Sequence, residues 1–260
     1  MDEVERAYSA TGTRWQDGPA RIYDRLADLL VARSPVDVAG ATVADVGAGT
    51  GAAGRAAKRA GAATVVSMDL ALGMLLADPA RPPALVADLL ALPVRGGAAD
   101  VAVAAFSLNH LADPVAGLHE CTRIVRPGGG VVVGAYAADD VHPVKEVVDA
   151  GLRRRGWVPP DWISWLRSEA MPHLADVAGA ASVARSAGLT AATVEHHRIA
   201  FPGLRAMDLV AWRLGMAQHA PFVATLSIDQ RHELEAEALT ELGDDPEPLV
   251  RSVVVLRTIV

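Results

Sequence analysis

The chain has 260 residues, of which 51% are hydrophobic and 21% charged, and its formal net charge is −7. This length suits one sizeable α/β domain with covering elements better than two full domains. The negative charge balance argues against non-specific binding to nucleic acid or to an anionic membrane surface.

Signals for cellular location are few. The single cysteine, Cys121, cannot form an internal disulfide, which fits a reducing compartment. The first twelve residues, MDEVERAYSATG, carry early acids and no apolar core, so they do not resemble a secretory signal. No run of about 18 apolar residues predicts a membrane span. We therefore expect a cytoplasmic protein.

The first 136 residues alternate between helical and strand patterns. Residues 21–33 have one apolar face and predict a helix before the first strand. The elements expected after it are strand 41–46, a glycine turn, helix 52–61, strand 63–69, helix 70–78, strand 83–88, strand 99–108, helix 112–125, a turn at 126–130 and strand 131–136. This alternation predicts a parallel, doubly wound sheet, in which ligands lie beyond the carboxyl ends of the strands.

The pattern changes after residue 136. Residues 137–175 contain three tryptophans but no clear strand. Later segments predict helix 176–189, strand 190–201, helices 203–216 and 228–242, and strand 249–260. The two late strands suggest an antiparallel addition to the sheet. We expect one domain, 1–260, with an N-terminal helical cap (1–40), a ligand-binding core (41–136) and cover or lid insertions (137–175 and 203–245).

The glycine turn in VADVGAGTG, residues 43–51, allows two interpretations. Gly49, Gly51 and Gly54 fit the G-x-G-x-x-G fingerprint, in which a helix N-terminus binds the pyrophosphate of a dinucleotide. S-adenosylmethionine has no phosphate and instead needs acids near its amino group and its ribose hydroxyls. The first ligand implies hydride transfer and the second methyl transfer.

Three aspartates follow or end successive strands. Asp45 ends the first, two residues before Gly47, and Asp69 ends the second, where a carboxylate can accept both ribose hydroxyls of either cofactor. Asp88 ends the third, where adenine's exocyclic amine would lie in S-adenosylmethionine. A plain tight turn and helix capping are the structural alternatives for these glycines and aspartates.

The order of five motifs resembles the class I S-adenosylmethionine-dependent methyltransferases, closest to the small-molecule branch that includes ubiquinone/menaquinone-type enzymes. The motifs are VADVGAGTG, VVSMD, VADLLALPV, DVAVAAFSLNHLADP and IVRPGGGVVV, within residues 20–136. The resemblance implies an α/β, Rossmann-like doubly wound sheet of seven strands, mostly parallel with an antiparallel last strand. It also implies an enzyme that uses S-adenosylmethionine and makes the dinucleotide match accidental.

The resemblance further implies roles for single residues at the cofactor. Gly47, Ala48 and Gly49, in the motif that Gly51 ends, would let the backbone approach the methionyl part, with Asp45 near its amino group. The nucleoside would be bound by Asp69 at the ribose, Leu70 against the adenine, and Asp88 with the Leu89 N–H at the adenine amine. Phe106 would lie near the sulfonium.

The segment AFSLNHL after the fourth strand bears on the acceptor. It lacks the Asn/Asp-Pro-Pro-aromatic loop of nucleobase and glutamine methylases and the aspartate of magnesium-dependent catechol enzymes. Asn109 and His110 are the polar groups expected closest to the methyl group. His110 is either a general base, since an unperturbed imidazole titrates near pH 6.5, or a packing residue at the start of a helix. No zinc-ligand spacing appears, so no metal is expected.

Aromatic residues outside the core are candidates for a lid. Tyr8 and Trp15 could close over the cofactor, although most of the five tryptophans are expected to pack cover helices onto the sheet. The predicted function is methyl transfer to a small, apolar or aromatic metabolite at oxygen, nitrogen or carbon, with a homodimer left open. The alternatives are a cofactor-binding protein with a non-methylating role, such as a cyclase or structural module, and a nicotinamide-dependent oxidoreductase.

Overall fold

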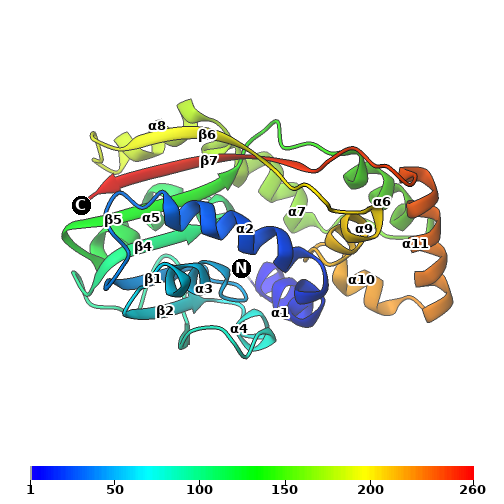
Figure 1. The fold of residues 1–260 in the computed structure, drawn as a ribbon, viewed down its shortest axis with the longest axis horizontal. Helices are drawn as coiled ribbons and strands as arrows, with labels where there is room; N and C mark the ends of the chain where they lie inside the picture. Colours follow the sequence, from blue (N-terminus) through cyan, green and yellow to red (C-terminus); the bar gives the residue numbers. More distant parts are fainter. Residues whose placement is uncertain (1) are drawn as a thin grey trace.

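The computed structural model describes residues 2–260, so Met1 of the expected N-terminal cap lies outside them. The fold is built on one seven-stranded sheet in the order β3-β2-β1-β4-β5-β7-β6 (Figure 1). The strands are β1 (Thr42–Val46), β2 (Thr64–Asp69), β3 (Ala84–Val86), β4 (Ala99–Ala105), β5 (Val125–Tyr136), β6 (Thr193–Ala200) and β7 (Val250–Ile259). The first five strands pair in parallel, and β7 runs antiparallel to both β5 and β6. The expected mostly parallel sheet with antiparallel pairing at its end is confirmed.

Helices cover both faces of the sheet, because the central strands are apolar on both sides. The helices α2 (Pro19–Ala32) and α3 (Ala52–Arg59) pack on one face, in front of the sheet in Figure 1, and share its apolar cluster. The helices α5 (Pro114–Ile124) and α8 (Val177–Ser186) pack on the other face. Asp113 caps α5 by accepting the Ala116 N–H at 3.1 Å. Both layers hold the strand ends in fixed positions.

The expected turn at residues 126–130 is instead part of β5. The ladder between β4 and β5 pairs Ala99 with Val125 and then Val101 with Gly130, so the extra residues form an irregularity inside the ladder. Gly128 has a φ of +79° there. The prediction of a turn was wrong, because these residues continue the strand with a local irregularity. Proline and glycine are common both in turns and at such irregularities, so the composition alone does not separate the two.

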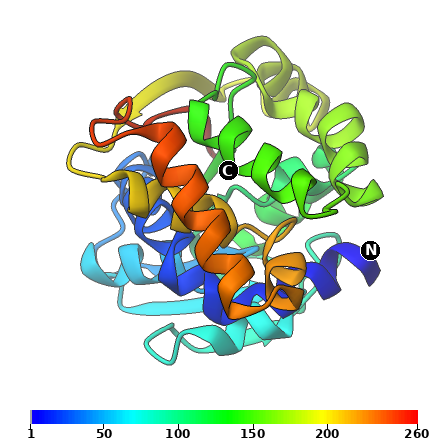
Figure 2. The same ribbon diagram turned by 90° about the vertical axis from the view of Figure 1, so that its right-hand side faces the viewer.

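The remaining helices gather at the carboxyl ends of the parallel strands, to the right in Figure 1 and facing the viewer in Figure 2. They are α1 (Asp2–Asp17), α4 (Leu72–Ala77), α6 (Pro143–Arg154), α7 (Asp161–Trp165), η2 (Leu166–Ala170), η3 (Met171–Leu174), α9 (Ala206–Leu214), α10 (Ala220–Thr225) and α11 (Ile228–Leu242), while η1 (Leu108–His110) follows β4. The short α10 was not predicted. Arg154 and Arg155, at the end of α6, both pair with Glu237 of α11, and these ion pairs join the two helices.

Candidate cofactor and acceptor site

A cavity of about 1570 Å³ opens at the carboxyl ends of the parallel strands, where the sheet topology predicts ligand binding. It brings together twelve of the residues that the sequence singled out. These are Tyr8, Trp15, Gly47, Ala48, Gly49, Asp69, Leu70, Asp88, Leu89, Phe106, Asn109 and His110. Asp45 and Gly51 are not among the residues of its wall.

The glycine loop after β1 approaches the loop after β4 so closely that Gly47 has no room for a side chain. Its φ is +70°, and a Cβ atom there would lie 2.2 Å from the Cβ of Ser107. The Ser107 hydroxyl donates to the Val46 carbonyl at 2.7 Å, which joins the two loops. Gly47 and Ala48 both donate their N–H groups to the Met68 carbonyl. The loop is therefore held on β2 with its backbone exposed to the cavity.

Asp69, at the end of β2, holds the glycine loop with one carboxylate oxygen. Its Oδ2 accepts the Gly49 N–H at 2.7 Å, and its Oδ1 accepts the Ala71 N–H at 2.8 Å. Burial raises the pKa of Asp69, while these two hydrogen bonds act in the opposite direction. Each oxygen keeps a lone pair that a hydroxyl in the cavity could use.

Asp45 lies behind the loop rather than in the cavity wall. It is fully buried, and its Oδ2 accepts the Gly54 N–H at 2.8 Å and the Ser67 hydroxyl at 3.3 Å. Gly54 belongs to the first turn of α3, so Asp45 accepts one of the N–H groups that have no partner within that helix. Its Oδ1 has no hydrogen-bond partner, and desolvation raises its pKa to about 7. Its side chain thus lies behind the glycine loop, and a role for Asp45 near the cofactor's amino group stays a prediction.

The walls expected for the nucleoside come from the loops after β2 and β3. Asp88 is half-buried and accepts the Leu90 N–H at 2.9 Å, so one of its oxygens shapes the local turn. The side chain of Leu89 would lie 3.5 Å from a Cβ atom at Gly47, which places it beside the glycine loop. Leu70 follows Asp69 in the same wall. Apolar groups and two carboxylates thus surround one end of the cavity.

Phe106 is the one non-glycine residue with positive φ, +60°, among residues 2–260. Such a conformation costs energy for an L-residue and needs support from its surroundings. Its N–H donates to the Gly134 carbonyl at 2.9 Å, and its ring stacks on Tyr136 with centroids 4.4 Å apart. The strained backbone directs the Phe106 ring across the middle of the cavity wall.

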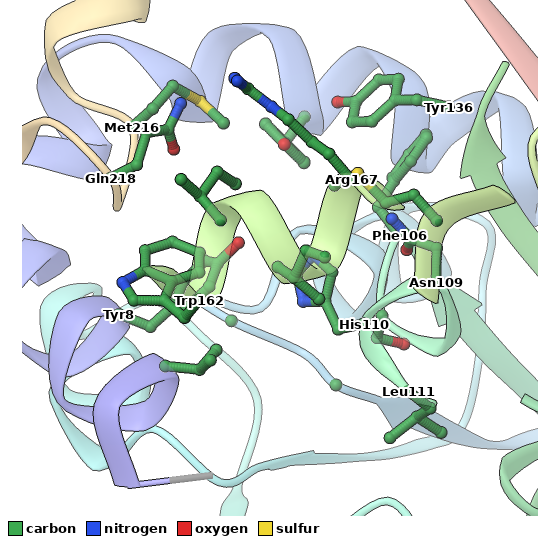
Figure 3. Close-up of a pocket in the computed structure, with 18 of the residues that line it drawn as sticks. Tyr8, Phe106, Asn109, His110, Leu111, Tyr136, Trp162, Arg167, Met216 and Gln218 are labelled. Carbon is green, nitrogen blue, oxygen red and sulfur yellow. The ribbon is translucent and has the colours of Figure 1, made fainter. Parts of the chain in front are cut away.

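His110 and Tyr8 meet across the cavity, the first from η1 and the second from α1 (Figure 3). Their ring centroids are 5.6 Å apart, and Tyr8 also lies 6.2 Å from Trp15 and 6.2 Å from Trp162. Burial lowers the pKa of His110 to about 4, so the imidazole is neutral at physiological pH. The pKa of 6.5 expected from the free side chain does not hold in this environment.

Several aromatic residues of the wall were not singled out from the sequence as site residues. Tyr23 meets the edges of Phe106 and Tyr136, at centroid distances of 5.7 and 6.1 Å. Tyr23, Tyr136, Trp162, Trp165 and Trp212 all line the cavity. Trp15, Trp157, Trp162 and Trp212 are buried, as expected of residues that pack cover helices, while Trp165 is 41% exposed.

Two buried ion pairs also form part of the wall. Arg251 makes a two-point contact with Asp140, at 2.9 and 2.8 Å, and Lys145 contacts the same carboxylate at 2.7 Å. Arg213 makes a similar contact with Asp149, at 2.9 and 2.8 Å. Asp140 is therefore more than a polar residue of the turn after β5, because it binds Arg251, which lies more than a hundred residues away along the chain.

Residues 2–260 contain no group of three or more histidine, cysteine, aspartate or glutamate side chains placed to hold a metal ion. No helix of this range is long and apolar enough to cross a membrane. His196 and His197 contact different partners, Ser252 and Glu195, as expected of neighbours on a strand.

Comparison with known proteins gives the family. Residues 44–133 match the model of a methyltransferase domain. The chain is 31% identical to a demethylmenaquinone methyltransferase of Clavibacter sepedonicus, over 65% of this chain and 69% of that protein. The chain therefore belongs to the class I methyltransferase family, in its small-molecule branch.

Solved structures agree with this fold. A putative methyltransferase from an antibiotic biosynthesis pathway of Anabaena variabilis has a TM-score of 0.63 and 15% identity, covering 91% of this chain and 97% of that one. A phosphoethanolamine N-methyltransferase of Haemonchus contortus, in complex with S-adenosylhomocysteine, has a TM-score of 0.54 and 17% identity, covering 89% of this chain and 52% of that one. This chain is an S-adenosylmethionine-dependent methyltransferase, which decides against the nicotinamide alternative.

Proposed function

We propose that the chain transfers the methyl group of S-adenosylmethionine to a small apolar or aromatic metabolite bound in the same cavity. The observation that carries the proposal is the continuity of this cavity from the glycine loop to the aromatic wall. Its volume of about 1570 Å³ exceeds the roughly 300–1000 Å³ of a typical ligand pocket. That leaves room for an acceptor beside the cofactor.

The residues present suit the cofactor. Gly47 and Gly49 expose backbone without Cβ atoms, Asp69 keeps free lone pairs at the edge of β2, and Leu70 and Leu89 supply apolar contact for a purine. In this assignment Asp45 acts through the loop, by accepting the Gly54 N–H of α3, rather than by direct contact. S-adenosylmethionine supplies an already activated methyl group on a positively charged sulfur.

The protein's part is then to align the acceptor and exclude water. The stacked rings of Phe106 and Tyr136 and the indole of Trp162 add flat apolar surfaces to the cavity wall, where a planar acceptor can stack. The similar protein of Clavibacter sepedonicus is named for demethylmenaquinone, a quinone, which supports an aromatic acceptor here. Tyr8 and Trp15, from α1, also line this cavity.

His110 is the proposed proton acceptor. Its imidazole is neutral above a pH of about 4, so it can take a proton throughout the neutral range. A base with so low a pKa removes protons effectively only from acidic groups, such as an enol or an acidic phenol. Asn109 lies beside it in the wall with its Oδ1 unpartnered, and we propose that it orients the acceptor.

A methyl-transfer screen tests the proposal. The protein is incubated with S-adenosylmethionine carrying a ¹³C-methyl group and a panel of phenols, quinols, aromatic acids and aliphatic amines. We expect labelled product from an aromatic member, and the carbon shift of the methyl group tells O-, N- and C-methylation apart. Transfer to aliphatic amines alone would overturn the aromatic assignment, and cofactor binding without transfer to any acceptor would favour a non-methylating role.

A further inference from the structure

Three hydrogen-bond donors in the cavity wall are buried without partners. They are Nη1 of Arg251, the indole Nε1 of Trp212 and the hydroxyl of Tyr136, which makes no hydrogen bond of good geometry but lies near the Tyr23 hydroxyl. All three residues line the cavity. A buried polar group without a partner is uncommon in folded proteins and calls for a ligand, a water or an ion.

The three donors belong to one cluster. The guanidinium carbon of Arg251 lies 4.0 Å from the ring centroid of Tyr136 and 4.7 Å from that of Trp212. Arg251 is held there because its Nε and Nη2 atoms bind Asp140, which leaves Nη1 without a partner. Tyr136 in turn stacks on Phe106 at 4.4 Å, so the cluster adjoins the residue expected near the reacting methyl group.

The chemistry of the cluster is that of donors. An indole nitrogen and a guanidinium can only donate hydrogen bonds. Burial raises the pKa of Tyr136 well above its usual value, so its hydroxyl is protonated. These groups together suit an oxygen that accepts several hydrogen bonds.

The charges nearby favour a negative ligand. Lys145, Arg213 and Arg251 lie in this part of the wall against the two carboxylates of Asp140 and Asp149. These five side chains are all at most 26% exposed, so water screens them only partly. The other acids of the wall lie outside this buried group; they are the exposed Glu3, Glu146, Asp161 and Asp176 and the half-buried Glu5, Asp69 and Asp88. The buried set thus keeps one positive charge in excess.

We propose that Arg251, Trp212 and Tyr136 form an oxyanion subsite, which makes the acceptor an aromatic molecule with an acidic oxygen, such as a carboxylate. This inference rests on the proposed function, because it places the acceptor in the same cavity. It narrows the acceptor class from any apolar metabolite to a planar acid.

The test measures binding of matched naphthalenes to the protein saturated with S-adenosylhomocysteine, by equilibrium dialysis. The probes are 2-naphthoate, its neutral carbonyl analogue 2-acetylnaphthalene, and apolar 2-ethylnaphthalene. We expect 2-naphthoate to bind best, because hydrogen bonds to a charged group are the stronger ones. Equal binding of the acetyl compound would overturn the need for charge, and no binding of 2-naphthoate would overturn the subsite.

Variants that remove one donor and keep its ring identify the subsite. Trp212→Phe and Tyr136→Phe should each weaken 2-naphthoate binding roughly tenfold to a hundredfold and leave 2-ethylnaphthalene within about threefold. Trp165→Phe, at the exposed side of the same cavity, is the control and should leave the ratio of the two affinities unchanged. Trp212→Phe and Tyr136→Phe leave the Arg251–Asp140 pair intact, so we expect both proteins to fold. If the ratio of the 2-naphthoate and 2-ethylnaphthalene affinities stayed unchanged in both Trp212→Phe and Tyr136→Phe, water alone would satisfy the donors and the proposal would be wrong.

The cofactor's own carboxylate is the other source of an anionic oxygen. S-adenosylhomocysteine and 5′-methylthioadenosine, which lacks the amino acid tail, distinguish the two. We expect Trp212→Phe and Tyr136→Phe to leave the ratio of these two affinities unchanged, and a selective loss for S-adenosylhomocysteine would overturn the acceptor assignment. Donor-dependent binding of 2-naphthoate without methyl transfer to any aromatic acceptor would keep the subsite and reject the proposed function. Methyl transfer to neutral aromatic acceptors at a rate that these variants do not change would keep the proposed function and reject the subsite.

Discussion

The carboxylate of Asp69, at the end of β2, accepts the backbone N–H of Gly49 at 2.7 Å. One side chain thereby fixes the loop after the neighbouring strand β1 and presents its remaining lone pairs to the cavity. The residue assigned to the ribose is thus also the residue that shapes the surface under the methionyl part. Any change at Asp69 affects both.

Replacing Asp69 should weaken cofactor binding without unfolding the protein. We expect Asp69→Ala to cost about 2–4 kcal/mol of binding free energy for S-adenosylhomocysteine, because hydrogen bonds to a charged group contribute about 1.5–3 kcal/mol each. Isothermal titration calorimetry measures the effect. Asp100→Ala is a matched control, since Asp100 also accepts a backbone N–H, from Thr42 at 2.7 Å, but lies outside the cavity wall. Unchanged affinity in folded Asp69→Ala would show that the ribose lies elsewhere.

Gly47 should tolerate no side chain. A second glycine, Gly188, separates the effect of backbone strain from that of steric overlap. Gly47 and Gly188 have φ values of +70° and +77°, so alanine is strained at both by about 1–2 kcal/mol. A Cβ atom at Gly47 would in addition overlap Ser107, whereas nothing lies within 4 Å of one at Gly188. We expect Gly188→Ala to lower the free energy of unfolding by that strain alone.

Gly47→Ala should lose a further 1–3 kcal/mol, roughly the cost of overpacking, together with most of its affinity for S-adenosylhomocysteine. Urea denaturation and calorimetry measure the two quantities. Equal destabilisation in both variants, with cofactor binding retained, would contradict the close approach of the two loops.

Asp45 should make the protein less stable as the pH rises. Its folded pKa of about 7 lies above the usual value of 3.8, so folding takes up a proton between these values. The unfolding free energy contributed by this group is therefore highest below pH 4 and falls until about pH 7. The decrease should amount to about 4 kcal/mol, since the pKa changes by about 3 units at roughly 1.4 kcal/mol per unit.

The variant Asp45→Asn imitates the protonated side chain and should lack this decrease. Urea denaturation from pH 4 to 8 compares the two proteins, and the difference between them removes the contribution of other groups, including Asp69. Parallel stability profiles for wild type and variant would mean that Asp45 is ionised in the folded protein throughout this range.

The sequence predicted the sheet well because its signals are local. Apolar strands and the glycine turn each depend on neighbours in the chain. Twelve of the predicted site residues also lie together at one edge of the sheet, as expected, since the carboxyl ends of parallel strands meet there. The helix α10 was missed because only six residues form it, too few for a periodic pattern.

The charged part of the wall could not be predicted in the same way. Arg251 lies on the last strand and Asp140 just after β5, and the antiparallel pairing of β7 with β5 brings them together. Trp212 reaches the same cluster from α9. No local pattern links positions so far apart in the chain. An arginine just before the apolar run VVVL of the last strand is the one sequence signal that could have drawn attention to it, and in the structure Arg251 is buried and paired.

The environment of His110 changes the expected pH dependence of methyl transfer. Burial lowers its pKa to about 4, so a rate that depends on the neutral imidazole should be constant from pH 6 to 8 and fall only as the pH approaches 4. His110→Ala should lower turnover of the aromatic acceptor roughly 10²–10⁴-fold and leave the affinity for S-adenosylhomocysteine nearly unchanged. It should also lose the acidic limb of the pH–rate profile.

The control variant is His119→Ala. His119 is exposed on α5 and lies outside the cavity wall, so this variant should behave as wild type. Circular dichroism at each pH separates loss of activity from unfolding, and normal turnover with an unchanged profile in His110→Ala would leave alignment of the two substrates as the whole mechanism.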